Sequence, residues 1–400
     1  MAGALEGIRI VEIAQELQGP YAAQYLADMG ASVIKIENRE TGDLSRWLAT
    51  RNFFPDAPHG HVSPYFLAVN RGKRSLTLDM KKPEGKEILK KLIDQADVLL
   101  TNYRPGVLDR LGFSYEDCTK TNPKLIYAQG TSWGPKGPWT RHPSRDTLAQ
   151  AAGGLIAKNG ISGPPVATGA AIADANGALA LAASILAALF VRERTGEGQK
   201  CGASIYGAVL AMQPLELSYT GATGRETPRA HRAHQLLRGM WGAFPTKNGH
   251  ICIAGCDDGR WPRFCKIMGL EHLENDPECD NTTRNFHGEK IERILDETFP
   301  KKTTEEWLEL LNGADILATK VQNYTDIMAS EQARVNGYIT KIPHHELGEV
   351  SLAGNPITLE GTPVNPTKPA PEWGQHTEEI LLEVGYDWEK IAELREKQVV

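Results

Sequence analysis

The sequence predicts an α/β protein with a Rossmann-like large domain, built on a parallel sheet, and a smaller α+β domain. Three observations support this fold class. The chain has 400 residues, more than one small hydrophobic core usually serves. Strand-like and helix-like segments alternate from Ile8 to Tyr103, as they do in the βαβ units that build parallel sheets. Beyond a helical middle, a second mixture of strand-like and helix-like segments follows.

The first alternation begins near the N-terminus. Residues 8–14 (IRIVEIA) are typical of a strand, residues 20–30 (PYAAQYLADMG) of a helix from Pro20 to Gly30, and residues 31–38 (ASVIKIEN) of a second strand. The pattern repeats with a strand at 74–80, an amphipathic helix at 83–96 and a strand at 97–103. Two such units in succession predict a doubly wound sheet.

A dinucleotide site is the first functional hypothesis that this start raises, because Glu37 ends the second strand where a ribose-binding acid can lie. The first turn, however, is AQELQGP and lacks the G-x-G-x-x-G that lets the backbone approach a pyrophosphate. The sequence also has no Walker A motif. We therefore set the nicotinamide hypothesis aside.

The rest of the chain supplies the remaining elements. Helices are expected at 144–155, along the alanine-rich run that starts near Gly169, and at 203–218, followed by a linker at about 220–233. The smaller domain is expected to contain a strand at 249–255 and helices at 259–269 and 303–314, the last capped by Thr303 or Thr304. The alternation at 348–363 predicts a hairpin, and two helices at 377–385 and 388–397 end the chain.

Composition narrows the function classes. The net charge of −6 argues against a general affinity for nucleic acid, which needs basic patches. The six scattered cysteines are typical of reduced thiols rather than of a secreted disulfide scaffold. No basic segment followed by an apolar one opens the sequence, and the uncharged run 177–191 is short for a membrane span. We expect a cytoplasmic protein with a long buried helix.

Asp174 stands at the head of that apolar helix. An Asp in a first helical turn often only complements the helix dipole, and taken alone this is the simpler interpretation. Here Gly169, Gly177 and several alanines allow close approach of a ligand, and the apolar run behind them excludes water. Desolvation raises the pKa of such a carboxyl and the dipole lowers it. We expect a carboxylate that stays ionised but poorly hydrated, as a nucleophile requires.

Residues 163–200 (GPPVATGAAIADANGALALAASILAALFVRERTGEGQK) resemble the central segment of the family III CoA-transferases, the group that contains formyl-CoA transferase and carnitine CoA-transferase. Segments 7–46, 70–113, 144–155 and 361–383 are similar to corresponding family segments in the same order. The resemblance covers nearly the whole chain. It implies that Asp174 is the catalytic nucleophile, which forms first a mixed anhydride and then an aspartyl-CoA thioester.

The same resemblance implies the other site residues. Coenzyme A, entering as acyl-CoA, would be bound by residues at matching positions, namely Gln18, Arg39, Leu78, Lys81, Asn102, Tyr103, Arg104, Arg110 and Arg145. Asn38 stands where formyl-CoA transferase has Arg, and Arg39 is the substitute. Asp146 is a second active-site acid. Gly239 and Trp241 match a mobile loop over the substrate, with too few glycines to support specificity for oxalate or formate. No metal is implied.

The resemblance further implies an interlocked-ring homodimer and a discontinuous large domain, at 1–215 and 330–400, with a linker and small domain at 216–329. The partners are an acyl-CoA donor and a carboxylic acid acceptor, with neither nucleic acid nor membrane. Two alternatives stay open. A racemase or epimerase of the same superfamily would use His142 as a base on the substrate α-carbon. A non-catalytic acyl-CoA-binding protein would share the basic contacts but would not need Asp174.

Overall fold

The fold was determined as a computed structural model, which describes residues 3–48, 62–160, 163–364, 366 and 368–400. The chain divides into two compact units. Unit 1 comprises Met1–Gly153, Gly169–Met212 and Ser330–Val400, and unit 2 comprises Gly154–Thr168 and Gln213–Ala329. Residues 154–168 and 213–215, which were predicted to lie in the large domain, thus belong to unit 2.

Unit 1 is built on a six-stranded parallel sheet with the strand order β3-β2-β1-β4-β5-β6. Its strands are β1 (Arg9–Ile13), β2 (Ser32–Glu37), β3 (Arg74–Thr77), β4 (Val98–Thr101), β5 (Ile126–Thr131) and β6 (Lys200–Ser204). This is the doubly wound order, with the reversal between β1 and β4. The predicted fold class is confirmed in its α/β character and its parallel sheet.

Helices cover both faces of the sheet. Neighbouring residues of a strand point to opposite faces, and here both faces carry apolar side chains that the helices bury. Ile10 packs with α1 (Gln18–Asp28) and α9 (Ile172–Thr195), whereas Val11 packs with α4 (Pro83–Asp94) and the C-terminal helices α18 (Thr377–Glu383) and α19 (Trp388–Glu396). Smaller helices complete the unit, namely α2 (Ser45–Leu48), α3 (Pro64–Asn70), α5 (Val107–Leu111), α6 (Tyr115–Thr119), α7 (Asp146–Ala152), α10 (Ile205–Ala211) and α17 (Glu331–Val335).

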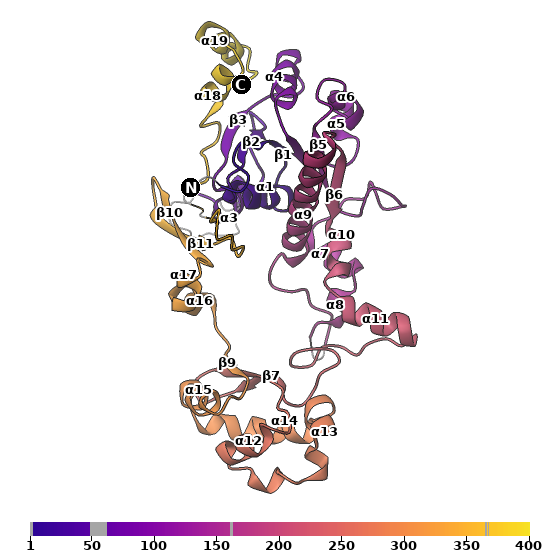
Figure 1. The fold of residues 1–400 in the computed structure, drawn as a ribbon, viewed down its shortest axis with the longest axis vertical. Helices are drawn as coiled ribbons and strands as arrows, with labels where there is room; N and C mark the ends of the chain where they lie inside the picture. Colours follow the sequence, from indigo (N-terminus) through magenta and orange to yellow (C-terminus); the bar gives the residue numbers. More distant parts are fainter. Residues whose placement is uncertain (1–2, 49–61, 161–162, 365, 367) are drawn as a thin grey trace. The chain divides into compact units, whose positions relative to one another are not determined.

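Helix α9 is the apolar helix that the sequence predicted, and it runs beside β5 and β6 and against α1 (Figure 1). By length and composition it is the one described helix that meets the criteria for a membrane span. Its Leu181 and Ile185 have no exposed surface, but Leu179, Phe190 and Val191 are exposed. One face therefore packs on the sheet and another apolar face lies open.

Unit 2 has its own small sheet, in which β8 (His250–Ala254) pairs antiparallel with β7 (Trp241–Pro245) and β9 (Ala318–Lys320). Its core includes residues of α12 (Trp261–Met268), α14 (Glu289–Thr298) and α15 (Thr304–Gly313). The unit also contains α8 (Leu155–Lys158), α11 (Pro214–Thr223), α13 (Asn281–Phe286) and α16 (Tyr324–Ala329). Thr303 caps α15 in a capping box with Glu306. The choice between Thr303 and Thr304 is thereby resolved.

Two local predictions were wrong. Residues 220–223 are not linker, because α11 begins at Pro214 and continues to Thr223 before Gly224 ends it with φ 66°. The hairpin is not formed within 348–363. Instead β11 (Gly348–Ala353) pairs with the preceding strand β10 (Ile339–His344), and the chain leaves the ladder at Asn355-Pro356, where proline lacks a donor.

Candidate active site

A cavity of about 530 Å³ opens in unit 1 at the carboxyl ends of β1, β4, β5 and β6. Its walls come from the loops that follow β1 and β4, from Thr131 at the end of β5, from Ile205 after β6, and from the first turn of α9. Ligands of doubly wound sheets bind at this edge, where the strand order reverses. The topology thus places a ligand site here without any glycine-rich motif.

The loop between β1 and α1 forms one wall of this cavity, and hydrogen bonds from both sides fix it. The Asn102 side chain accepts from the Gln15 N–H at 3.0 Å and donates to the Gln15 carbonyl at 2.8 Å. The Asp43 carboxylate accepts from the Glu16 N–H at 3.1 Å. Glu16 lies in the left-handed region with φ 63°, which costs a non-glycine residue about 1 kcal/mol or more. These bonds hold the loop in that conformation.

A buried network of charges stands behind the loop. The Lys35 ammonium contacts Glu12 at 2.8 Å and Asp43 at 2.7 Å, and all three side chains are fully buried. Lys73 contacts the second Glu12 oxygen at 2.7 Å. Burial alone would raise the pKa of Asp43, but the Lys35 charge and the donated hydrogen bonds hold it below its ordinary value. Asp43 is therefore an ionised anchor for the Glu16 backbone.

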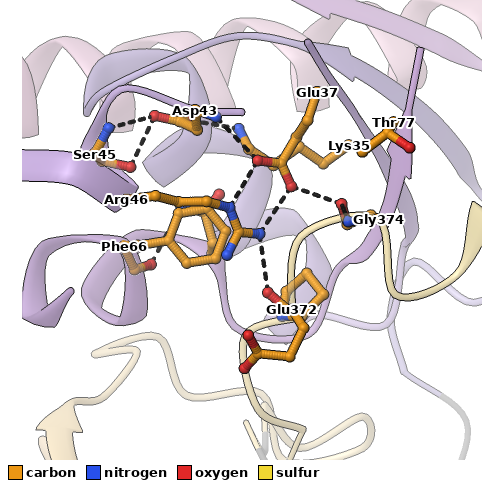
Figure 2. Close-up of polar contacts among 12 residues, drawn as sticks. Lys35, Glu37, Asp43, Ser45, Arg46, Phe66, Thr77, Glu372 and Gly374 are labelled. Carbon is orange, nitrogen blue, oxygen red and sulfur yellow. Dashed lines mark hydrogen bonds and ion pairs between the residues drawn. The ribbon is translucent and has the colours of Figure 1, made fainter. Parts of the chain in front are cut away.

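Glu37, the acid considered for a ribose, belongs to the same region. Its carboxylate binds Arg46 through two 2.8 Å contacts and accepts from the Ser75 hydroxyl at 2.6 Å. Figure 2 shows Arg46 lying over Phe66 with its guanidinium turned toward Glu37. Glu37 is 2% exposed, so it joins segments of the fold and faces no ligand.

Asp146 and Asp174 meet at the start of α9. The N-cap residue of this helix, Ala171, offers no side-chain hydrogen bond, and Asp146 supplies one instead. One oxygen of its carboxylate accepts from the Ala173 N–H at 2.8 Å and the Asp174 N–H at 3.0 Å, while the other accepts from Gln150. Asp146 thus caps the helix that carries Asp174.

The Asp174 side chain lines the cavity and receives no hydrogen bond or ion pair from any residue that the structure describes. Burial raises the pKa of Asp174 to about 7, and the charges of Asp146 and Glu16 add to this effect against Arg145. The sequence analysis expected a carboxylate that stays ionised, whereas burial raises the pKa of Asp174 to about 7. Near neutral pH the carboxyl is divided between its protonated and ionised forms.

The predicted coenzyme A residues fall into two groups. The cavity is lined by Gln18, Asn102, Tyr103, Arg104 and Arg145, together with Asp174. It is not lined by Arg39, Leu78, Lys81, Arg110 or Asp146. Leu78 is fully buried, and the Arg39 guanidinium donates to the Val400 carbonyl at 3.2 Å. His142, the base of the racemase alternative, is exposed and does not line the cavity.

The two predicted loop residues lie in unit 2. Gly239 has φ 77°, and a Cβ atom there would lie 2.0 Å from the Arg284 carbonyl oxygen, so only glycine fits. Trp241 begins β7, and its ring packs against Gly255. A role of either residue at the substrate stays a prediction.

Among the described residues, the side chains of His344, His345 and Glu372 can bring three ligand atoms within 4.8 Å of one another. His344 Nδ1 already accepts hydrogen bonds from the N–H groups of Glu346 and Leu347, and none of the three lines the cavity. The polar side chains that line the cavity include carboxylates, amides and arginines.

Comparison with known proteins decides the family. Residues 5–377 match CoA-transferase family III. The chain belongs to this family. A succinyl-CoA:glutarate CoA-transferase of Homo sapiens is 32% identical over 403 residues, which cover 99% of this chain and 90% of the relative. A formyl-CoA:oxalate CoA-transferase of Streptomyces coelicolor is 32% identical over 418 residues, which cover 100% of this chain and 100% of the relative.

A solved structure supports the same assignment. A CAIB/BAIF family protein from Brucella suis superposes with a TM-score of 0.86 at 28% identity, covering 96% of this chain and 100% of that protein. This family III protein is therefore an enzyme of the CoA-transferase class, whose named relatives act on CoA thioesters.

Two residues near Asp174 of this family III protein were missed in the sequence. Glu16 lines the cavity, and its carboxylate bonds to Arg145 at 3.0 Å. Tyr65 lies on α3, and burial followed by the negative charge of Asp174 raises the pKa of its hydroxyl. A polar residue in the loop that follows the first strand was the available signal for Glu16, whereas nothing in the sequence brings Tyr65 to Asp174.

Proposed function

We propose that the enzyme moves CoA from an acyl-CoA thioester to a free carboxylic acid by covalent catalysis at Asp174. The Asp174 carboxylate attacks the acyl carbonyl, which gives a mixed anhydride and releases the CoA thiolate. The thiolate then attacks the aspartyl carbonyl, which releases the donor acid and leaves an aspartyl-CoA thioester. The carboxylate of the acceptor acid repeats these two steps in reverse and regenerates Asp174.

The observation that carries this proposal is the state of Asp174. The Asp174 carboxyl is partly buried, lines the cavity and has no hydrogen-bond partner among the described residues, and burial raises its pKa. Partial loss of solvation makes an anionic nucleophile more reactive. A raised pKa also means that the ionised form is a stronger base and hence a better nucleophile. An acid that only complemented a helix dipole would have its pKa lowered.

The neighbouring residues have separate roles in this proposal. Asp146 is a positioning residue, because it binds the backbone of the turn that carries Asp174. Arg104 lines the cavity and supplies positive charge for the CoA phosphates. Arg145 lines the same cavity but is paired with Glu16, beside Asp174. Asn102 acts mainly through Gln15, whose backbone it holds.

The racemase alternative finds no support in the cavity, because His142 lies outside its walls. A non-catalytic acyl-CoA-binding protein has no use for a desolvated acid next to the ligand, whose ionisation costs free energy. Acyl transfer through Asp174 explains this cost, so we favour it over both alternatives.

We also propose a cytoplasmic homodimer. The apolar face of α9 exposes Leu179, Phe190 and Val191, which are 41%, 62% and 42% exposed in the single chain. A contiguous apolar face of this kind is typical of a surface that a second subunit covers. A second copy of the chain on this face would also reduce the access of water to the head of α9. A stable monomer in sizing chromatography would contradict this part of the proposal.

The test of the reaction is to trap the acylated enzyme. Purified protein is mixed with succinyl-CoA or formyl-CoA, the thioesters named for its relatives, and quenched with hydroxylamine. Peptide mass spectrometry then locates any hydroxamate. We expect modification at Asp174 in the wild type and in Glu116→Gln, a control that loses an exposed carboxylate outside the cavity. The covalent route fails if Asp174→Asn turns over as fast as the wild type.

A further inference from the structure

Glu16 is held in the cavity wall with little freedom. Its backbone has the left-handed φ of 63°, and the Asp43 carboxylate binds its N–H at 3.1 Å. The preceding Gln15 is bound on both its N–H and its carbonyl by Asn102. Asp43 is itself fixed by the buried Lys35. A side chain on a backbone defined in this way keeps its direction, which a binding site requires.

Among the described residues, the Glu16 carboxylate has one cationic partner. Its Oε2 lies 3.0 Å from Arg145 Nη1, and both side chains line the cavity that contains Asp174. Arg145 is 69% exposed on its side chain, whereas Glu16 is 31% exposed. The arginine is therefore largely solvated, whereas the glutamate is partly buried and still lines the cavity. The negative charge of Glu16 also reaches Asp174, whose pKa it helps to raise.

We propose that Glu16 determines the substrate class of the site by disfavouring acyl groups that carry a second negative charge. This inference rests on the proposed acyl transfer at Asp174. The acyl group must lie beside Asp174, within a cavity whose wall already holds the Glu16 carboxylate. Neutral acyl groups meet no such opposition. Selection by a repulsive group is a common basis of specificity.

Two physical effects both weaken the binding of an acyl group that carries a second carboxylate. A carboxylate at the far end of the acyl chain is repelled by Glu16 in a site where the effective dielectric constant is low. The same carboxylate would also compete with Glu16 for Arg145, and that exchange breaks an existing ion pair. In both cases the neutral isostere Gln at position 16 removes the penalty and frees Arg145 for the substrate.

The experiment compares the binding of succinyl-CoA and butyryl-CoA, which have the same chain length and differ by one carboxylate. Binding is measured by calorimetry in the Asp174→Asn background, so that no turnover intervenes. We expect butyryl-CoA to bind more tightly. Adding Glu16→Gln should shift the ratio of the two dissociation constants toward succinyl-CoA by roughly tenfold. Adding Arg145→Gln instead should shift this ratio toward butyryl-CoA, because Glu16 then has no neutralising partner beside it.

Controls keep the result specific. Adding Glu116→Gln, which removes an exposed carboxylate outside the cavity, should leave the ratio unchanged. Free CoA should bind the Glu16→Gln variant as tightly as its parent, which shows that the site is intact. A ratio that Glu16→Gln leaves unchanged while free CoA still binds overturns the inference alone. Failure of CoA and both thioesters to bind the Asp174→Asn parent overturns it together with the proposed function.

Discussion

Asp174 should destabilise the folded protein at the pH at which it works, so Asp174→Asn should make the protein inactive and more stable. The reason is the difference between two states. In the unfolded chain the carboxyl has its ordinary pKa of 3.8, whereas in the folded protein burial and the charges of Asp146 and Glu16 raise the pKa to about 7. Between these values the folded state binds more protons than the unfolded state. Stability therefore falls as the pH rises through this range.

The magnitude follows from the same two pKa values. A difference of about 3 units at about 1.4 kcal/mol per unit gives a cost of about 4 kcal/mol, which is fully present above pH 7. At pH 5 most of the folded protein carries the proton on Asp174, and the cost is about 2 kcal/mol. The wild type should thus lose about 3 kcal/mol between pH 5 and pH 8 that an asparagine at this position cannot lose.

The assay is urea denaturation of the wild type and Asp174→Asn at pH 5 and pH 8 at one ionic strength. Every other titrating group is common to both proteins, so its contribution cancels in the comparison. Direct effects of the amide on packing cancel as well, because they are the same at both pH values. Equal losses of stability in the two proteins between pH 5 and pH 8 would refute the claim that Asp174 has a raised pKa.

Three further predictions concern the same site. The value of kcat/KM for CoA transfer should rise with pH through about 7, because only ionised Asp174 attacks; a flat profile from pH 5.5 to 8.5 would contradict this. Asp146→Ala removes the acceptor for two N–H groups of α9 and should cost about 1 kcal/mol in urea denaturation, with a larger loss in trapping of Asp174 than in CoA binding. Asp43→Asn leaves Lys35 with one carboxylate partner and should cost about 3 kcal/mol or more; stability like that of the wild type would show that the buried network is not anchored there.

The sheet could be predicted from the sequence because its signals are local. Strands β1, β2 and β4 are largely buried on both faces, and each is short and contains β-branched residues, although β1 and β2 also carry charged residues. The helices between them begin at or near prolines, as at Pro20 and Pro83. The hairpin at 339–353 was misplaced because pairing partners are not a local property.

The site was only partly predictable for a similar reason. Asp174 is conspicuous in the sequence, because it is the charged residue at the head of a long apolar run. That its side chain has no hydrogen bond among the described residues is not visible there, because the neighbouring donors are taken by Asp146, 28 positions earlier. The raised pKa of Tyr65 and the ion pair of Glu16 with Arg145 likewise depend on distances across the fold. Charge type and spacing do not determine such distances.

The two acids at the head of α9 explain how one carboxylate becomes reactive in a place that normally stabilises carboxylates. The first turn of a helix offers free N–H groups to any nearby acid. Here Asp146 accepts from the N–H groups of Ala173 and of Asp174 itself. Those donors are consequently occupied, and the Asp174 side chain in the same turn is left without them. One acid stabilises the helix, and its neighbour is left poorly solvated and available for attack on an acyl carbonyl.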